Sequence, residues 1–571
     1  MTGTSNAATI SIVETLKLLD GSFSSFANGV AEGRYAYWLG SGISRERFPM
    51  LPGLIEKVLE YLRSHADLSN DECPHNIALV EALNLATLSN TESAQIDLTQ
   101  PVSNWPILDS IKERLTNQYD QLLDIEVGNC ASDVLIWEGI DVANTYANPE
   151  IEPDAEHLGI AVLIREGVVK ELASANWDGL VEKAVDFLSA DVSPLSVCVM
   201  SSDLQQEHNK PKLIKFHGCA VRAAEDEATY RPYIVGRASQ IANWTNSDNV
   251  KALASHLEIT ICERPTLMLG LSVQDFNIKN LFGSAQAKLP WHWPGDRPSY
   301  VFSEQQVTSG QSSLLQIVYR EEYEGQMRAE IRKGSRIQAF AKPLLLALIL
   351  HILSEKFTRL IQTLPAFADP IMLDWVSTGV AAFRNTIAAC DSGDHFEYTK
   401  QFIRQMSLLR RLISTGISDP GDVSYEPLTD RSAAEIVSNA ETQSNGLPEV
   451  GCAISILGHG LAKNFWKIGP VNEPEATAAM AMVGEGETQA RLFVAATVEA
   501  EWKFYADGRL REGESAILIR AKPYETMQRS PSKAPGRTGK LKTRKITIPD
   551  LISMGMSPDQ LMEKFRVEAA I

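Results

Sequence analysis

The sequence predicts an α/β fold in its first half, built on a parallel sheet that helices cover on both faces. Three observations predict it: near-continuous apolar runs of strand length, helix-like periods between them, and small or polar residues directly after several of the runs. A run without polar alternation indicates a strand buried on both faces, which is typical of parallel sheets. The expected strands lie at residues 35–39, 168–175, 194–200, 211–216, 265–270 and 299–302.

The alternation of strand and helix is interrupted after the first expected strand. A helix is predicted at 53–64, because apolar residues recur there with helical spacing at Leu54, Ile55, Val58, Leu59 and Leu62. Residues 65–150 are more polar and helical in character. We interpret them as a helical insertion that caps the carboxyl edge of the sheet.

The character of the chain changes after about residue 310, which predicts a C-terminal α+β domain over residues 309–571 and a first domain over 1–308. Residues 310–440 show helical periods, and the apolar run at 343–353 predicts a buried helix with Pro343 in its first turn. A strand-rich section is predicted after about residue 450, with a hairpin at Asp507-Gly508 between two apolar runs. The segment 529–545 is rich in Pro, Gly, Ser and basic residues and predicts a loop.

The charge, the cysteines and the apolar runs of the sequence argue against several classes of protein. The 571 residues carry a net charge of −19, which argues against a protein that coats nucleic acid or an anionic membrane with its general surface. The seven cysteines form no C-x-x-C pair, so neither a disulfide framework nor a structural zinc site is expected, and no metal is predicted. The beginning of the sequence has no secretory pattern, and the longest apolar run is too short for a bilayer. We therefore expect a cytoplasmic protein.

Four short loops that follow predicted strands carry the residues suited to chemistry. The first is Gly40-Ser41-Gly42-Ile43-Ser44, and the second contains Asn176 and Asp178. The third contains His217, and the fourth contains Gly270, Ser272 and Asp275. Because the carboxyl ends of strands in such a sheet converge on one crevice, these loops predict a nucleotide site with polar groups inside it.

The order of these motifs resembles the sirtuin-like NAD-binding family. The segments are G-S-G-I-S, N-W-D-G-L, F-H-G and G-L-S, and they span about residues 30–305. With M-L-P-G-L-I-E-K-V-L-E-Y-L after the first loop and Asp275 after the last, the pattern is most similar to the prokaryotic branch of antiphage defence. The resemblance implies a Rossmann-like sheet and NAD⁺ as substrate.

The sequence departs from the protein deacylases of that family in two places. Deacylases carry two C-x-x-C pairs for zinc, whereas the segment after His217 contains only Cys219. Their first loop continues with D-F-R, whereas here Arg45-Glu46-Arg47-Phe48 follows. The departure favours water over an acyl-lysine as the nucleophile, and hence hydrolysis of NAD⁺ to nicotinamide and ADP-ribose.

The resemblance also implies roles for the loop residues. Asn176 and Asp178 would lie beside the nicotinamide ribose, and His217 would contact ribose hydroxyls or water as a general base. Backbone N–H groups from Gly40 to Ser44 would hold the pyrophosphate, while Gly270 and Ser272 would line the adenosine half. Asp275 is a further candidate contact.

Each of these residues also has a structural interpretation. The glycines of the first loop form a tight turn in many proteins, Asp178 suits an Asx turn, and Asp275 suits the cap of a helix that begins near Phe276. His217 could be a buried, hydrogen-bonded histidine. We interpret the remaining histidines as structural and Trp177 as a packing residue.

The sequence leaves three alternative functions open. The first is an NAD⁺ hydrolase that acts as the toxic effector of a bacterial antiphage system and is switched on by a partner or by assembly. Members of the branch pair with short Argonaute proteins or HerA-like ATPases, and others carry their sensor in the same chain. The second is a protein deacylase or ADP-ribosyltransferase, and the third is a non-catalytic sensor of NAD or ADP-ribose. We expect a homo- or hetero-oligomer, with nucleic acid reached only indirectly or through residues 529–545.

Overall fold

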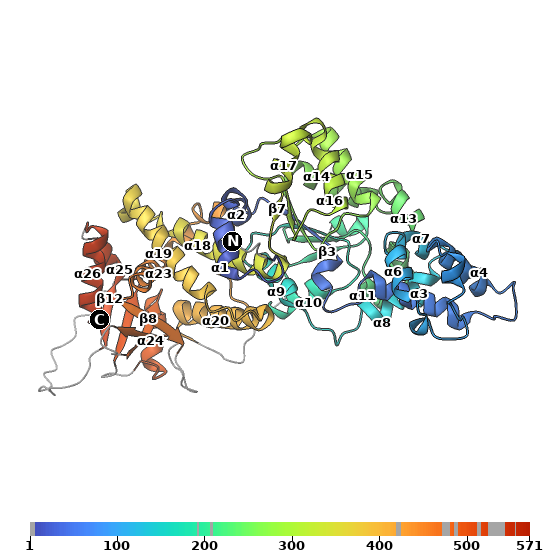
Figure 1. The fold of residues 1–571 in the computed structure, drawn as a ribbon. Helices are drawn as coiled ribbons and strands as arrows, with labels where there is room; N and C mark the ends of the chain where they lie inside the picture. Colours follow the sequence, from blue (N-terminus) through green and yellow to red (C-terminus); the bar gives the residue numbers. More distant parts are fainter. Residues whose placement is uncertain are drawn as a thin grey trace, which may run out of the picture.

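Seven parallel strands form the sheet at the centre of the first half (Figure 1). The structure is a computed structural model that describes residues 6–190, 193–205, 209–417, 424–470, 480–484, 489–510, 515–522, 543–553 and 555–571. The strand order is β3-β4-β2-β1-β5-β6-β7. The strands are β1 (Ala36–Leu39), β2 (Glu171–Ser174), β3 (Ser196–Cys198), β4 (Lys212–Lys215), β5 (Thr266–Leu269), β6 (Tyr300–Ser303) and β7 (Arg336–Ile337).

Alternate residues of each strand face opposite sides of the sheet, and both sides are buried. Tyr37 and Leu39 of β1 pack in one apolar cluster, whereas Trp38 between them packs in another. Helices of the first cluster are α1 (Ile12–Asp20), α2 (Ser24–Ala31), α9 (Ala155–Arg165), α10 (Leu180–Phe187) and α18 (Ala341–Ile361). Helices of the second are α14 (Lys251–Glu263), α15 (Phe276–Lys288) and α16 (Ser309–Tyr319). The predicted doubly covered parallel sheet is confirmed.

The insertion between β1 and β2 is helical, as predicted, and builds its own apolar cluster. Its core is joined from outside the insertion by Ala220, Ala223 and Ile234. The helices here are α3 (Leu51–His65), α4 (Pro74–Leu85), α5 (Asn90–Ser93), α6 (Leu108–Thr116), α7 (Tyr119–Leu123), a π-helical turn (Leu135–Gly139) and α8 (Val142–Tyr146). After β4 follow α11 (Ala220–Glu225), α12 (Glu227–Tyr230) and α13 (Ala238–Asn243).

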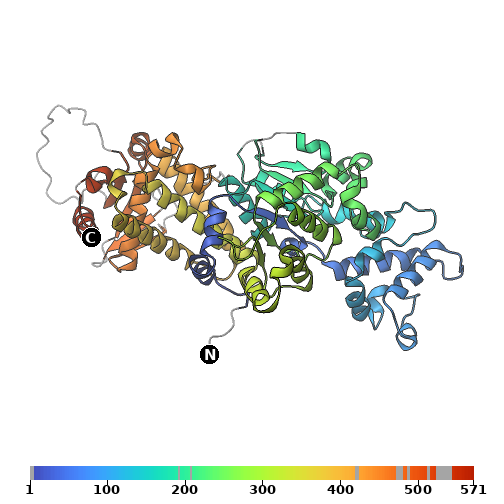
Figure 2. The ribbon, with the colours of Figure 1, turned by 90° about the horizontal axis from the view of Figure 1, so that it is seen from above.

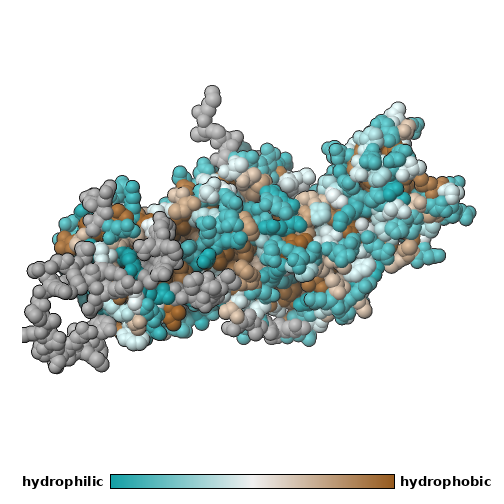
Figure 3. All heavy atoms as spheres, turned by 90° about the horizontal axis from the view of Figure 1, so that it is seen from below, coloured by the Kyte–Doolittle hydropathy of each residue, from teal (hydrophilic) through white to brown (hydrophobic). Residues whose placement is uncertain are grey.

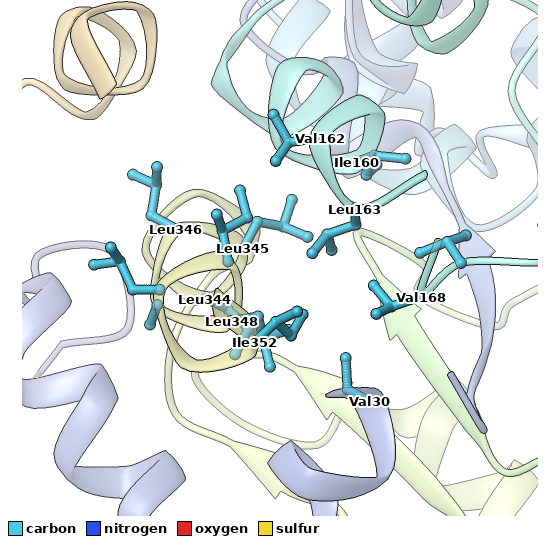
Figure 4. Close-up of a cluster of buried hydrophobic side chains, with 14 of the residues drawn as sticks. Val30, Ile160, Val162, Leu163, Val168, Leu344, Leu345, Leu346, Leu348 and Ile352 are labelled. Atoms are coloured by element: carbon cyan, nitrogen blue, oxygen red, sulfur yellow. The ribbon is translucent and has the colours of Figure 1, made fainter. Parts of the chain in front are cut away.

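Helix α18 joins the two halves of the chain. Residues Pro343 to Leu353 are buried along its whole circumference, because α1, α2 and α9 pack on one side and C-terminal helices on the other. Figure 4 shows Leu345 of α18 directed toward Leu163 of α9, with Val168 and Val30 closing the same cluster. The sheet takes β7 from beyond residue 308, so the central body continues into the start of the second half.

A second, mixed sheet of five described strands lies in the C-terminal region, in the order β12-β11-β10-β9-β8. These are β8 (Trp466–Pro470), β9 (Met480–Gly484), β10 (Gln489–Ala495), β11 (Ala516–Arg520) and β12 (Arg544–Thr547). Helix α17 (Gly325–Gly334) precedes β7 and packs with α16 at the central sheet. The helices of the C-terminal region are α19 (Pro370–Ala388), α20 (His395–Thr415), α21 (Ala433–Ile436), α22 (Ala440–Ser444), α23 (Leu447–Ala462), α24 (Val498–Ala506), α25 (Ile548–Ile552) and α26 (Pro558–Ala569).

Two predictions for this region need correction. The hairpin at Asp507-Gly508 is wrong, because β10 and β11 pair in parallel and α24 forms the crossover between them. The strand-rich section begins after α23 rather than at about residue 450. Of the predicted basic loop 529–545, the residues up to 542 lie outside the described residues, and Arg544 and Lys545 belong to β12.

The molecule is elongated, with the helical insertion at one end, the parallel sheet in the middle and the mixed sheet at the other end (Figures 1 and 2). The face in Figure 3 shows hydrophobic residues in small groups among hydrophilic ones. The most exposed large apolar side chains, Ile371, Val567 and Trp502, belong to three different helices. Among the helices that the structure describes, none has a stretch long and apolar enough to cross a lipid bilayer.

Candidate functional site

A cleft opens at the carboxyl edge of the parallel sheet, where the four predicted loops meet. Adjacent strands place them side by side, since Leu39 at the end of β1 is in register with both Ser174 of β2 and Leu269 of β5. The cleft encloses about 930 Å³ of empty space, counted with its open mouth. Nine of the predicted site residues line it: Gly40, Ser41, Ser44, Asn176, Asp178, His217, Gly270, Ser272 and Asp275.

The backbone N–H groups of the first loop are only partly available for the predicted contact with pyrophosphate. Residues Ser41–Ser44 form one turn of 3₁₀-helix, and Ile43 is buried in the apolar cluster beneath the sheet edge. The N–H of Gly40 donates to Leu269 O at 3.0 Å, that of Gly42 to Gly270 O at 3.0 Å, and that of Ile43 to Gly40 O at 3.2 Å. Three of the five amides predicted to hold pyrophosphate are therefore used inside the protein. Gly42 and Ile43 support the loop without lining the cleft.

The glycine at position 40 is required by a close approach of two backbones. A Cβ atom there would lie 2.4 Å from Gly270 O and 2.7 Å from Leu271 Cα. Backbone atoms cannot move aside as a flexible side chain would, so the two loops must separate to admit a side chain. The contact fixes the distance between the first and fourth loops.

We expect Gly40→Ala to lower the free energy of unfolding by about 1–3 kcal/mol, which is the usual effect of forcing an extra methyl group into a packed site. Gly469→Ala is the matched control, because a Cβ at Gly469 meets no atom of the described residues within 4 Å. Urea unfolding of both variants measures the difference. Equal stability of the two variants would show that the loops are not in contact as described.

Asn176 carries an unsatisfied buried atom. Its side-chain Nδ2 donates to Gly40 O at 3.2 Å and, more weakly, to Ser44 Oγ at 3.4 Å. Its Oδ1 has no hydrogen-bond partner among the residues that the structure describes, although the residue is only 7% exposed. A buried carbonyl oxygen without a partner is unfavourable, and in a ligand cleft it is a ready acceptor for a ligand hydroxyl group or a water molecule.

Asp178 lies beside Asn176 and is almost fully buried. Its Oδ1 accepts the N–H of Leu180 at 3.1 Å, so the predicted Asx-type role at the start of α10 is present. Its Oδ2 accepts the hydroxyl of Ser44 at 3.0 Å and also helps to line the cleft wall. Asp178 is therefore both a local cap and a buried carboxylate at the site.

His157 is a residue that the sequence analysis missed. It lies on α9, is fully buried, and its Nε2 is 3.1 Å from Ser44 Oγ. Its signal in the sequence was the polar pair Glu156-His157 at the start of an otherwise apolar helix. Burial lowers the pKa of His157 to about 4, so its ring is neutral near pH 7.

His217 follows β4 and is also buried, and burial lowers its pKa. Its Nε2 lies 2.9 Å from Nδ2 of Asn277, a second residue that was missed. The Asn277 amide orientation is set because its Oδ1 accepts the N–H of Ile278 at 2.9 Å. Nδ2 therefore donates to His217, which makes Nε2 an acceptor and leaves the ring proton on Nδ1.

Asp275 occupies the N-cap position of α15 but makes no capping hydrogen bond with its side chain. Instead it accepts the phenol hydroxyl of Tyr119, which belongs to the helical insertion. Burial and the neighbouring carboxylate raise the pKa of Tyr119, so this hydroxyl remains a donor. With Leu123 and Tyr146, Tyr119 places the insertion over the cleft.

A buried ammonium supports the second loop from below. Lys215 of β4 is 1% exposed, and its Nζ donates to the backbone oxygen of Asp178 and to Glu182 Oε1 at 2.9 Å. Its Nζ is also 3.4 Å from Cys219 Sγ. A lysine two residues before His217 therefore holds the backbone at Asp178 and connects the second loop to the third.

Trp177, predicted to be a packing residue, makes a T-shaped contact with Tyr146 and donates from Nε1 to Val235 O at 3.3 Å. It also lines the cleft. In the part of the chain that the structure describes, no group of three or more His, Cys, Asp or Glu side chains is arranged to hold a metal ion.

Residues 170–323 match a family model, that of the SIR2-like domain. The matched segment contains Asn176, Asp178, His217 and the fourth loop, whereas the first loop and the insertion precede it. No curated protein matches the chain. This segment is sirtuin-like, and members of that family are NAD-dependent enzymes that bind NAD⁺.

Proposed function

We propose that the protein is an NAD⁺ hydrolase that releases nicotinamide and ADP-ribose and serves as the toxic effector of a bacterial antiphage system. The observation that carries the catalytic part is the unsatisfied, buried Oδ1 of Asn176 in a cleft that also contains Asp178 and His217. The SIR2-like match supports NAD⁺ as the substrate. The defence role rests on the sequence resemblance.

The buried carboxylate supplies the electrostatic part of the mechanism. Departure of nicotinamide leaves positive charge on the ribose, and a fixed negative charge nearby lowers the free energy of that transition state. Asp178 is held by two hydrogen-bond donors, Ser44 and Leu180, so its carboxylate needs no reorganisation during the reaction. Asn176 Oδ1 orients a ribose hydroxyl or the attacking water.

His217 serves the proposed reaction in its neutral form. Its Nδ1–H is available as a donor to a ribose hydroxyl or water, while Nε2 is engaged by Asn277. A role as general base through Nε2 requires the substrate or a water molecule to replace that contact. The geometry thus favours orientation of the ribose as the first role of His217.

Hydrolysis is favoured over deacylation by what surrounds the third loop. The segment after His217 contributes Ala220, Ala223 and Ile234 to the core of the helical insertion. That insertion covers the cleft with Tyr119, Leu123 and Tyr146. The region that follows the histidine is thereby committed to packing against the insertion, which supports water as the acceptor.

Control by assembly is part of the proposal because free hydrolysis of NAD⁺ would be lethal to the host cell. None of the described residues of the second half lines the cleft. It packs on the first half through α18, whose apolar surface is covered within this chain. A short Argonaute or a HerA-like ATPase is the proposed kind of partner, and homo-oligomerisation is the alternative route to activation.

The test is incubation of the purified protein with NAD⁺, with and without an acetyl-lysine peptide, followed by product analysis. We expect nicotinamide and ADP-ribose in equal amounts without the peptide, at a low rate that rises on assembly. Nicotinamide release only with the peptide would instead support a deacylase. Binding of NAD⁺ without any product, in all assembly states, would support a sensor.

A further inference from the structure

A chain of hydrogen bonds runs from α9 into the cleft. His157 Nε2 lies 3.1 Å from Ser44 Oγ, and Ser44 Oγ lies 3.0 Å from Asp178 Oδ2. The three residues are 0%, 3% and 5% exposed, so water does not compete for these contacts. The direction of donation along the chain decides what it can do.

The start of α9 fixes that direction. The backbone N–H of Asp154 donates to His157 Nδ1 at 3.1 Å, because His157 is the third helical residue and closes a capping box there. Nδ1 is therefore an acceptor, and in the neutral ring the proton resides on Nε2. His157 donates to Ser44, and the single hydroxyl proton of Ser44 is left to donate to Asp178.

The N-cap of α9 is itself held firmly. Asp154 Oδ1 accepts the N–H of Ala155 at 2.7 Å, and Oδ2 accepts Lys342 Nζ at 3.1 Å. Lys342 lies in the first turn of α18 and also pairs with Glu46 Oε2 at 2.6 Å, just after the first loop. The position of His157 is consequently fixed by both halves of the chain.

The direction of these hydrogen bonds distinguishes the cluster from a nucleophilic triad, although it contains a serine, a histidine and an aspartate. In a triad the serine donates to the histidine and the aspartate contacts the other ring nitrogen. Here Asp178 contacts the serine, and His157 Nε2 already carries a proton. Ser44 is therefore not activated as a nucleophile.

We infer that His157 is a positioning residue for the proposed reaction: through Ser44 it orients the Asp178 carboxylate and the Asn176 amide in the cleft. The inference rests on the proposed NAD⁺ hydrolysis for its kinetic consequences. Asn176 Nδ2 lies 3.4 Å from Ser44 Oγ, so the same hydroxyl group favours the amide orientation that leaves Oδ1 free. Without the donor from His157, Ser44 can rotate and both orientations loosen.

Two substitutions at position 157 compare a side chain that keeps both hydrogen bonds with one that keeps neither. Glutamine suits the third position of a capping box, so His157→Gln keeps an acceptor for Asp154 N–H and a donor for Ser44. His157→Leu keeps comparable bulk but has neither. We expect kcat to stay within about fivefold in His157→Gln and to fall by about a hundredfold in His157→Leu, with a smaller change in KM.

Loss of the cap alone needs its own control. Gln560→Leu removes the third residue of a capping box on α26, far along the chain from the cleft residues. It is expected to lower the melting temperature without an effect on kcat. Circular dichroism at the assay temperature confirms that each variant compared is folded.

A double-mutant cycle tests whether His157 acts through Ser44. In the Ser44→Ala background, His157→Leu should lower kcat by less than about threefold further, because the link to Asp178 is already broken. Additive effects of the two substitutions would overturn the inference, as would a wild-type kcat in His157→Leu. If His157→Leu does not fold, the cycle uses His157→Gln instead, and the quantity compared is the loss of kcat on Ser44→Ala in the His157 protein and in His157→Gln.

A measurement that does not depend on turnover tests the tautomer. Nitrogen-15 spectra of histidine-labelled full-length protein, assigned with His157→Gln, should show His157 neutral with its proton on Nε2 from pH 6 to 8. Burial lowers its pKa to about 4, so no titration is expected in that range. A proton on Nδ1 would overturn the inference. Absence of NAD⁺ cleavage by the wild-type protein in every assembly state would instead contradict the proposed function. The nitrogen-15 spectra would still show which ring nitrogen of His157 carries the proton.

Discussion

Replacing Asn176 by alanine is expected to lower NAD⁺ turnover by about a hundredfold or more and to change the free energy of unfolding by about 1 kcal/mol or less. The effect on turnover is expected to be much larger than the effect on stability, because the two ends of the Asn176 amide make different contacts. Its Nδ2 makes only the 3.2 Å contact to Gly40 O and the weaker one to Ser44, so little folding free energy is lost. No described residue donates a hydrogen bond to its Oδ1, and in the proposed reaction that atom accepts from a ribose hydroxyl or water.

The measurement is NAD⁺ loss in the activated protein, with stability taken from urea unfolding. Asn28→Ala is a suitable control, because the Asn28 side chain also makes a hydrogen bond, with Oδ1 accepting from His351 Nε2 at 3.1 Å, but it lies on α2 away from the cleft. Asn28→Ala should keep the wild-type rate. Wild-type turnover in Asn176→Ala would remove this residue from the site.

Six strands of the parallel sheet could be predicted because each is a run with no polar alternation. The burial patterns of β1, β5 and β6 are continuous, and such runs leave little choice but a strand between two helical layers. The seventh strand, β7, has only the residues Arg336–Ile337, and it is defined by pairing with β6. No run of two residues carries a detectable pattern.

The hairpin prediction failed for a related reason. Asp507-Gly508 is a strong turn signal, and Gly508 does adopt a positive φ of 66°. The turn follows α24, however, because Val498 to Ala506 form a helix rather than the first strand of a pair. A local turn signal does not show which elements it joins, and parallel pairing of β10 and β11 is a tertiary property.

The loops of the candidate site could be predicted, whereas their partners could not. Asn176, Asp178 and His217 each follow a strand, so the rule that strand ends converge was sufficient to bring them together. The contacts that define their state come from His157, Asn277 and Tyr119, which lie on helices. Which helical side chain reaches a cleft depends on helix packing, and the sequence pattern does not contain that information.

The largest expected change in stability comes from a buried ion pair at the joint between the two halves. Lys356 of α18 and Glu166, at the end of α9, are 0% and 1% exposed in their side chains, and Lys356 Nζ lies 2.5 Å from Glu166 Oε2. The same ammonium donates to Glu166 O at 2.7 Å and to Thr429 O at 2.9 Å. Glu166 Oε1 accepts from Tyr425 and Leu428. Burial lowers the pKa of Lys356, and the carboxylate opposes that shift.

We expect Lys356→Met to lower the free energy of unfolding by about 3–5 kcal/mol, because it leaves the Glu166 carboxylate buried without its counter-charge. The double variant Lys356→Met with Glu166→Gln should recover part of that loss, since no uncompensated charge remains and glutamine still accepts from Tyr425.

Lys170→Met is the matched control: Lys170 pairs with Glu435 at 2.6 Å across the same joint, but both side chains are 43% exposed. Loss of that pair should change the free energy of unfolding by less than about 1 kcal/mol. Urea unfolding followed by circular dichroism measures all four proteins. Equal effects of Lys356→Met and Lys170→Met would show that the buried pair does not hold the two halves together.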